Sequence, residues 1–169
     1  MFVDETKARG VLLTAAAVHP ADLAAARRAI RGLVMPGQRR IHFIQENDGR
    51  RKMILDRIAE FSPLATIYDG SALPRRRQRE ACLRELVTDL VIQDARMLVL
   101  ERDDSIVDMD NRVLYARIHE VNCVKLRYEH LRTHEEPLLA IPDAIAWCWQ
   151  RGDPWRQRVR EMVVGVRTL

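Results

Sequence analysis

The feature that most constrains the fold is an almost uninterrupted apolar run, RMLVLE, at positions 96–101. Its four central residues are all apolar, so a strand formed here has no polar face to turn toward water. Strands of this kind lie inside parallel or mixed sheets, where helices cover both faces. At 169 residues the chain is long enough to bury such a core within one domain. The run therefore predicts a central strand in a sheet that is covered by helices on both sides.

Strand-like and helix-like segments alternate along the rest of the chain. The segments with the apolar alternation or short apolar runs of strands are 1–4, 10–18, 39–46, 65–70 and 124–132. The segments with the apolar spacing of helices are 22–34, about 74–95, 113–122 and 141–152. A further helix is expected from a cap at Asn47 or Asp48 to Phe61, and a last one begins at Pro154. The first two strands are expected to pair as an antiparallel hairpin through the polar stretch ETKAR. This order predicts an α/β fold, one mixed β-sheet with helices on both faces, in a single domain over residues 1–169.

Some helix ends carry capping signals. Asp22 is a candidate N-cap for the helix over 22–34, because its side chain can accept a hydrogen bond from the first free backbone N–H groups. Pro142 falls in the first turn of the helix over 141–152, and Gly152 falls at its end. Both placements are the usual ones for these residues, so they support the predicted boundaries.

The composition is that of an ordinary globular protein, with 47% hydrophobic and 31% charged residues. The formal net charge of +4 and the sequence pI of about 9.3 describe a mild basic excess. Such an excess is compatible with a nucleic-acid partner, and it is equally expected from a general bias toward arginine and alanine. Charge alone therefore does not identify the partner.

The cysteines and the N-terminus indicate the compartment. Cys82, Cys123 and Cys148 are widely separated and form no C-x-x-C pair, which is typical of buried thiols in a reducing environment. Acids at positions 4 and 5 replace the basic region of a signal peptide, and no apolar run has the length of a membrane span. We expect a cytoplasmic protein that does not engage a membrane.

Strong acids recur at the ends of the predicted buried elements. Asp4 ends the first strand, Glu101 ends the RMLVLE strand, and Asp143 opens the helix that contains AIAWCW. Chemistry in open α/β sheets collects at strand ends, and carboxylates that converge there raise one another's pKa unless a cation neutralises them. Oxygen ligands of this kind suit Mg²⁺ or Mn²⁺. Each acid alone also has a structural explanation, such as the helix dipole for Asp143, so the hypothesis depends on their combination.

His42 and Glu46 form a second candidate pair. In a strand over 39–46, Ile41 and Phe43 would share one face, with His42 and Glu46 together on the other. A core histidine with a hydrogen-bonded ring is an equally good explanation for His42. A zinc site is disfavoured because the other histidines have no compact ligand spacing, and the sequence contains no phosphate-binding glycine loop and no nucleophile elbow.

Basic residues cluster near the starts of two predicted helices, where cations oppose the helix dipole, and Arg39 and Arg40 begin the 39–46 segment. Nucleic-acid phosphate would offset that cost, and a solvated face is the alternative. The candidate nucleic-acid contacts are Arg39, Arg40, Arg50, Arg51, Lys52, Arg75, Arg76, Arg77 and Arg79.

Four short motifs resemble a large, mostly uncharacterised prokaryotic family with an RNase H-like fold. They are FVDET at the start, the following GVLLTAAAV, the mid-chain I-H-F and the late P-D-A-I-A-W. The family typically begins hydrophobic-D-E-S, has a histidine after its first helix, and carries A-D-hydrophobic-hydrophobic-A near its end. The motifs occur here in the family's order over most of the chain. Thr6 replaces the usual serine and keeps a hydroxyl, and Pro142 replaces the usual alanine.

The resemblance implies a metal-dependent phosphodiesterase site of the RNase H or RuvC type. It matches Asp4, Glu101 and Asp143 to the metal-binding acids, and Glu5 and His42 to further motif positions. We therefore expect a nuclease that uses Mg²⁺ or Mn²⁺ to hydrolyse phosphodiester bonds in DNA or RNA. The expected catalytic residues are Asp4, Glu5, His42, Glu46, Glu101 and Asp143. The alternative is a non-catalytic module that binds nucleic acid or protein and retains the fold, and a homodimer is left open.

Overall fold

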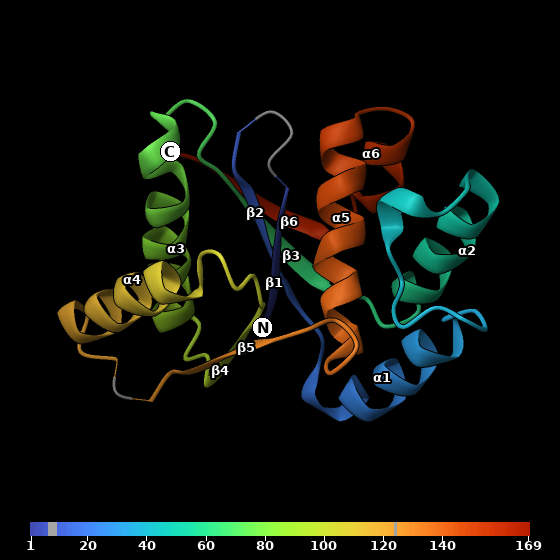
Figure 1. The fold of residues 1–169 in the computed structure, drawn as a ribbon, viewed down its shortest axis with the longest axis horizontal. Coiled ribbons are helices and arrows are strands. Elements are labelled where there is room, and N and C mark those ends of the chain that lie inside the picture. Colours follow the sequence, from blue (N-terminus) through green and yellow to red (C-terminus); the bar gives the residue numbers. More distant parts are fainter. Residues whose placement is uncertain (7–9, 124) are drawn as a thin grey trace.

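The computed structural model describes residues 1–6, 10–123 and 125–169, and in these ranges it forms one six-stranded mixed sheet flanked by helices (Figure 1). The strands are β1 (Phe2–Thr6), β2 (Leu12–Ala17), β3 (Leu64–Asp69), β4 (Met97–Glu101), β5 (Arg127–Leu131) and β6 (Val163–Thr168). The helices are α1 (Leu23–Gly32), α2 (Asp48–Ala59), α3 (Arg75–Ile92), α4 (Val107–Glu120), α5 (Ala140–Arg151) and α6 (Trp155–Val159). The predicted α/β class, with one mixed sheet and helices on both faces, is confirmed.

The sheet has the strand order β5-β4-β1-β2-β3-β6. β1, β2 and β3 are antiparallel neighbours, while β4 and β5 run parallel to β1, and β6 runs parallel to β3. The predicted hairpin of the first two strands is therefore confirmed, although its turn at 7–9 lies outside the described residues. Position 124, in the strand predicted over 124–132, also lies outside them. The RMLVLE run forms β4, which lies between β5 and β1 as an interior strand, with Leu98, Val99 and Leu100 buried.

Each face of the sheet has its own core (Figure 1). On one face α1, α2, α5 and α6 cover the sheet, and Phe2 and Val99 pack with Ile141 and Ile145 of α5. On the other face α3 and α4 pack over Val3 and the side chains next to it. Successive strand residues alternate between these faces, so β1 sends Phe2 toward α5 and Val3 toward α3.

The predicted strand at 39–46 is wrong. Phe43–Gln45 forms a short 3-10 helix after an extended His42, and the positions beside β2 are taken by β1 and β3. Ile41 and Phe43 are both buried, so the alternation of apolar and polar residues in this segment reflects a loop that packs its apolar side chains into the core. Arg51 donates hydrogen bonds to the carbonyls of Phe43 and Ile44, which satisfies backbone groups that have no partner strand.

The capping of the first helix and the last strand differ from the prediction. Asp22 makes no side-chain capping hydrogen bond, and the ring of His19 instead accepts one from Ala21 N–H at 3.3 Å, ahead of a 3-10 turn. The helix after Pro154 ends at Val159, and the chain returns as the edge strand β6 beside β3. Asn47 does cap α2, accepting from Arg50 N–H at 3.0 Å.

Within the described residues, no helix has both the length and the apolar content needed to cross a membrane. Cys82 and Cys148 are buried free thiols, and Cys123 is a half-buried one.

Candidate functional site

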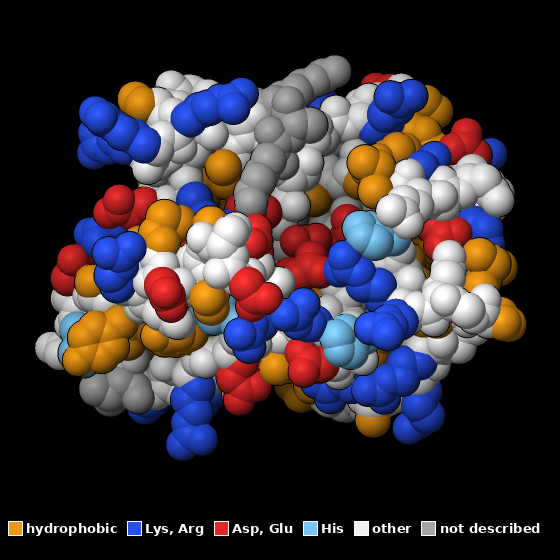
Figure 2. Space-filling view, viewed as in Figure 1, with side chains coloured by type: hydrophobic (Ala, Val, Ile, Leu, Met, Phe, Trp, Pro, Cys, Tyr) orange, Lys and Arg blue, Asp and Glu red, His pale blue; other side chains and the backbone are white. Residues whose placement is uncertain are grey.

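A cleft of about 650 Å³ opens where β1 and β4 end beside the first turn of α5. The prediction that Asp4 ends the first strand is wrong, because β1 continues to Thr6 in its pairing with β2. The parallel register that pairs Val3 with Leu100 nevertheless brings the next residues, Asp4 and Glu101, to neighbouring positions where the pairing of β1 with β4 ends. Asp4 lies two residues after Phe2, and Glu101 two after Val99, so both acids face the α5 side. Asp143 in the first turn of α5 completes the group. Figure 2 shows acidic side chains in a hollow of this face, with basic ones beside them.

The charges of these acids are strongly perturbed. Burial, and then repulsion from Asp143 and Glu101, hold the pKa of Asp4 well above its usual range. Burial, helped by the charge of Glu101, raises the pKa of Asp143 to about 6. Burial also acts to raise the pKa of Glu101, but hydrogen bonds from Thr133 and Asp4 and the charge of Arg40 outweigh it, and the pKa is lowered. The pKa values of Asp4 and Glu101 are thus shifted in opposite directions.

Arg40 lies in the middle of this cluster. Its guanidinium forms an ion pair with Glu101 and donates to Thr133 Oγ1 at 2.9 Å. Thr133 Oγ1 in turn donates to Glu101 Oε1 at 2.7 Å. The other terminal nitrogen of Arg40 lies 2.8 Å from Nε2 of His42. Because arginine has only donors, Nε2 must accept, and His42 is a neutral imidazole here. Its pKa is lowered by burial and by the charge of Arg40.

Backbone groups fix two of the acids. Glu5 N–H donates to Asp4 Oδ1 at 2.7 Å, and Phe43 N–H donates to Asp143 Oδ2 at 3.3 Å. The second contact is made possible by the short 3-10 helix, which directs the Phe43 amide toward α5. The segment that is not a strand therefore serves to position Asp143.

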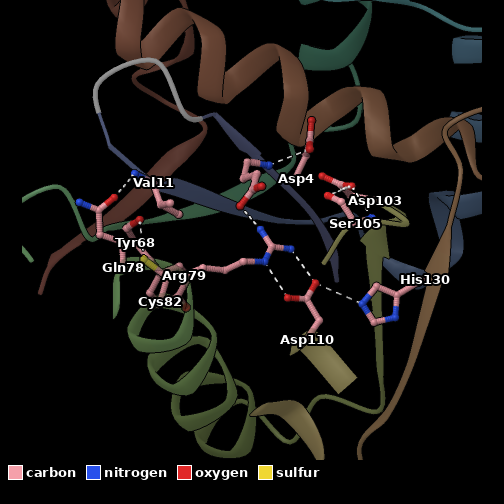
Figure 3. A network of polar contacts seen from close by, with 11 residues as sticks. Asp4, Val11, Tyr68, Gln78, Arg79, Cys82, Asp103, Ser105, Asp110 and His130 are labelled. Carbon is pink, nitrogen blue, oxygen red and sulfur yellow. Dashed lines mark hydrogen bonds and ion pairs between the residues drawn. The ribbon is translucent and has the colours of Figure 1, made fainter. Parts of the chain in front are cut away.

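A second network borders the cleft between β1 and α3 (Figure 3). Arg79 donates twice to Asp110 of α4, with both distances 2.6 Å, and forms an ion pair with Glu5. His130 Nε2 lies 3.4 Å from Asp110 Oδ2 on the other side. Burial acts to raise the pKa of Asp110, but the hydrogen bonds from Arg79 and His130 prevail and lower it. Glu5 and Arg79 line the cleft and at the same time tie β1 to α3 and α4.

Seven of the residues expected from the sequence line the cleft: Asp4, Glu5, Arg40, His42, Arg79, Glu101 and Asp143. Glu46 is not among its lining residues. It is 5% exposed and pairs with Arg50 at 3.2 Å, because the 3-10 turn breaks the strand periodicity that would have placed it beside His42.

The other predicted nucleic-acid contacts fall outside the cleft lining. Arg50 donates to Glu46 and to the carbonyl of Leu33, and Arg51 stacks on Trp147 with its guanidinium 4.3 Å from the ring centroid. Both arginines thus hold α2 in place. The remaining predicted contacts are exposed on the surface: Arg39, Lys52 and the α3 arginine cluster, which is Arg75, Arg76 and Arg77.

Sequence reasoning missed several cleft residues. Arg102 and Arg132 follow the neighbouring parallel strands β4 and β5, and Asp104 bridges them at 2.6 and 2.7 Å. Their position after adjacent strands is a signal that could have found them. Thr133 carries no such signal, since its role depends on contacts with Arg40 and Glu101 that arise only in the folded chain.

The acids suit a hard divalent cation. Among the side chains that the structure describes, no three carboxylate, imidazole or thiol groups are arranged to hold a metal ion directly. Mg²⁺, however, is usually bound through one or two carboxylates, and water and substrate oxygens complete its shell. Asp4 and Glu101 are adjacent oxygen donors, and Asp143 lies close enough to perturb Asp4. The donor set therefore fits Mg²⁺ or Mn²⁺ held by one or two of these carboxylates together with water.

No protein-family model matches the chain, and no curated protein does. Among solved structures, the chain is similar to one in the structure of the PCNA:RNase HII complex from Archaeoglobus fulgidus. The TM-score is 0.57 and the identity 17%, over 96% of this chain and 77% of that chain. This likeness, together with the strand order, establishes an RNase H-like α/β fold. Membership of the prokaryotic family named above stays a prediction.

Proposed function

We propose that this protein is a divalent-metal-dependent phosphodiesterase that hydrolyses nucleic acid. The observation that carries the proposal is the convergence of Asp4, Glu101 and Asp143 on one face of the sheet, in an open cleft. Buried carboxylates that raise one another's pKa are costly to the fold, and such arrangements are concentrated at functional sites. The similarity to the chain from the RNase HII complex supports the same class of reaction.

Mg²⁺ or Mn²⁺ would be held by one or two of the carboxylates of Asp4, Glu101 and Asp143. The ion would lower the pKa of a bound water and stabilise charge on the leaving oxygen. Phe43 N–H and Glu5 N–H keep the carboxylates of Asp143 and Asp4 oriented toward the cleft. His42 is neutral, so it can accept a proton once its Nε2 is no longer hydrogen-bonded to Arg40. Glu46, which lies outside the cleft lining, has no part in this scheme.

The substrate would lie along the cleft as a polyanion. Arg102 and Arg132 line it, and between them they have one bridging carboxylate, that of Asp104. A substrate phosphate would accept forked hydrogen bonds from these two guanidinium groups in place of the Asp104 carboxylate. The α3 arginine cluster is exposed and would extend the contact with a longer strand.

The rival is a non-catalytic binding module, and the Arg40–Glu101 ion pair is the observation in its favour, since a guanidinium already neutralises one of the acids. Calorimetric titration of the purified protein with Mn²⁺ separates the two. We expect wild type to bind Mn²⁺ and to cleave labelled DNA or RNA, and Asp4→Asn to bind the metal weakly and not to cleave. Asp48→Asn, which changes an exposed acid outside the cleft, is the matched control. Absence of Mn²⁺ binding to wild type, or unchanged cleavage by Asp4→Asn, would contradict the proposal.

A further inference from the structure

Arg40 is the one element of the cluster that neither the motifs nor the proposed metal chemistry explains. Arg40 lies in the loop that follows α1, so its side chain approaches the acids from this loop and not from the sheet or from α5. Its guanidinium contacts Glu101, Thr133 and His42 together. A half-buried arginine with three polar partners is a built arrangement, in contrast to the exposed α3 arginine cluster.

The contact with Glu101 conflicts with metal binding at the same carboxylate. The Arg40 nitrogen and the Thr133 hydroxyl both use Oε1 of Glu101. A divalent ion on Glu101 would stand within a few ångströms of a guanidinium in a partly buried site, where like charges repel strongly. A divalent ion and the Arg40 guanidinium on the same carboxylate would therefore repel each other at short range.

The surroundings allow Arg40 to move. On one side the guanidinium faces the open cleft, which Arg40 itself lines together with Arg102 and Arg132. The loop that carries it includes exposed Met35 and a glycine at position 37 with φ of +84°, and belongs to no helix or strand. The side chain can therefore turn from the acids toward the space that a substrate phosphate would occupy, without disturbing the sheet.

We infer that Arg40 is a displaceable counter-ion. It neutralises Glu101 while no divalent ion is bound, and metal binding expels its guanidinium into the cleft, where the freed N–H groups contact a phosphate of the substrate. The inference rests on the proposed function. Its consequence is that the metal and the nucleic acid bind cooperatively, since each favours the displaced position of Arg40. The same movement releases Nε2 of His42.

The alternative is that Arg40 is a fixed brace that holds Glu101 in place for the metal. The two roles predict opposite effects of removing the charge. Without a competing cation the site should bind metal more tightly, whereas without a brace Glu101 would lose its orientation and metal binding would weaken. Metal affinity therefore discriminates between them without any measurement of activity.

The test is calorimetric Mn²⁺ titration of the full chain as wild type, Arg40→Gln and Arg102→Gln. Arg102→Gln removes the same charge from the same cleft, and because Arg102 pairs with Asp104 while Arg40 pairs with Glu101, it serves as the control. We expect Arg40→Gln to bind Mn²⁺ about tenfold more tightly than wild type, and Arg102→Gln to change the affinity much less. Equal or weaker binding by Arg40→Gln would overturn the inference and leave the proposed function standing. Absence of Mn²⁺ binding to both wild type and Arg40→Gln would overturn the inference and the proposed function together.

Nuclear magnetic resonance supplies a measurement on the wild-type protein, which does not depend on the folding of a variant. The side-chain Nε–H signal of Arg40, assigned with Arg40→Lys, should shift as Mg²⁺ is added and saturate together with metal binding. A signal that does not move while Mg²⁺ binds would overturn the inference. Cooperativity is tested with a fluorescent phosphorothioate oligonucleotide: Mn²⁺ should tighten its binding to wild type, and this gain should be lost in Arg40→Gln.

Discussion

Replacing Asp143 by Asn should stabilise the metal-free protein while abolishing the proposed cleavage. In the folded state burial and the charge of Glu101 raise the pKa of Asp143 from 3.8 to about 6. The folded protein therefore holds a proton that the unfolded chain releases between pH 3.8 and about 6, and its stability falls as pH rises through this window. One pKa unit corresponds to about 1.4 kcal/mol, so the ionised Asp143 costs about 3 kcal/mol above pH 6. Asn removes that cost and keeps an oxygen for Phe43 N–H.

The assay is urea denaturation in EDTA at pH 4 and at pH 7. At pH 7, Asp143→Asn should exceed wild type by up to about 3 kcal/mol, or roughly 6–12 °C in Tm for a domain of this size. At pH 4 the two should be nearly equal. Asp48→Asn, at an exposed site, controls for loss of a surface charge. Mg²⁺ should stabilise wild type more than the variant, because the ion binds the folded state only. A variant no more stable than wild type at pH 7, with an unchanged pH dependence, would refute the electrostatic reasoning.

The other predictions concern binding, catalysis and folding. Asp4→Asn should keep or strengthen nucleic-acid binding, because a negative charge leaves the cleft, while cleavage stops. Filter binding and a cleavage assay on the same variant measure the two effects, and a loss of binding together with cleavage would contradict the prediction. Changing Arg102 and Arg132 together to Ala should weaken binding of a labelled oligonucleotide and flatten its salt dependence more than the same change in the α3 arginine cluster, and equal effects would argue against the cleft as the binding path. Arg79→Met should destabilise the fold by about 3–5 kcal/mol in urea denaturation, because it leaves the buried carboxylate of Asp110 without its main partner; a loss below about 1 kcal/mol, typical of an exposed pair, would show that the network is not structural.

The sequence by itself determined the layers of the fold and the position of the acids along the chain. A run such as MLVL favours an interior strand, and helices with one apolar face are expected to cover such a strand. Glu101 ends β4 as the local pattern predicted, whereas Asp4 lies inside β1, which runs two residues further than predicted. Their meeting on the α5 side follows from the two-residue period of a strand, once the parallel register is known.

Tertiary structure decided the partners of each charge and the fate of the ambiguous segments. The alternation at 39–46 fits a strand and a loop equally well, and in the folded chain the segment forms a 3-10 turn outside the sheet, with Glu46 outside the cleft lining. Arg40, Arg51 and Arg79 have the same side chain and similar sequence surroundings. One contacts the acids of the cleft, one stacks on Trp147, and one joins Glu5 to Asp110. Long side chains reach partners far away in sequence, and the free energy of each pair depends on burial and geometry that exist only after folding.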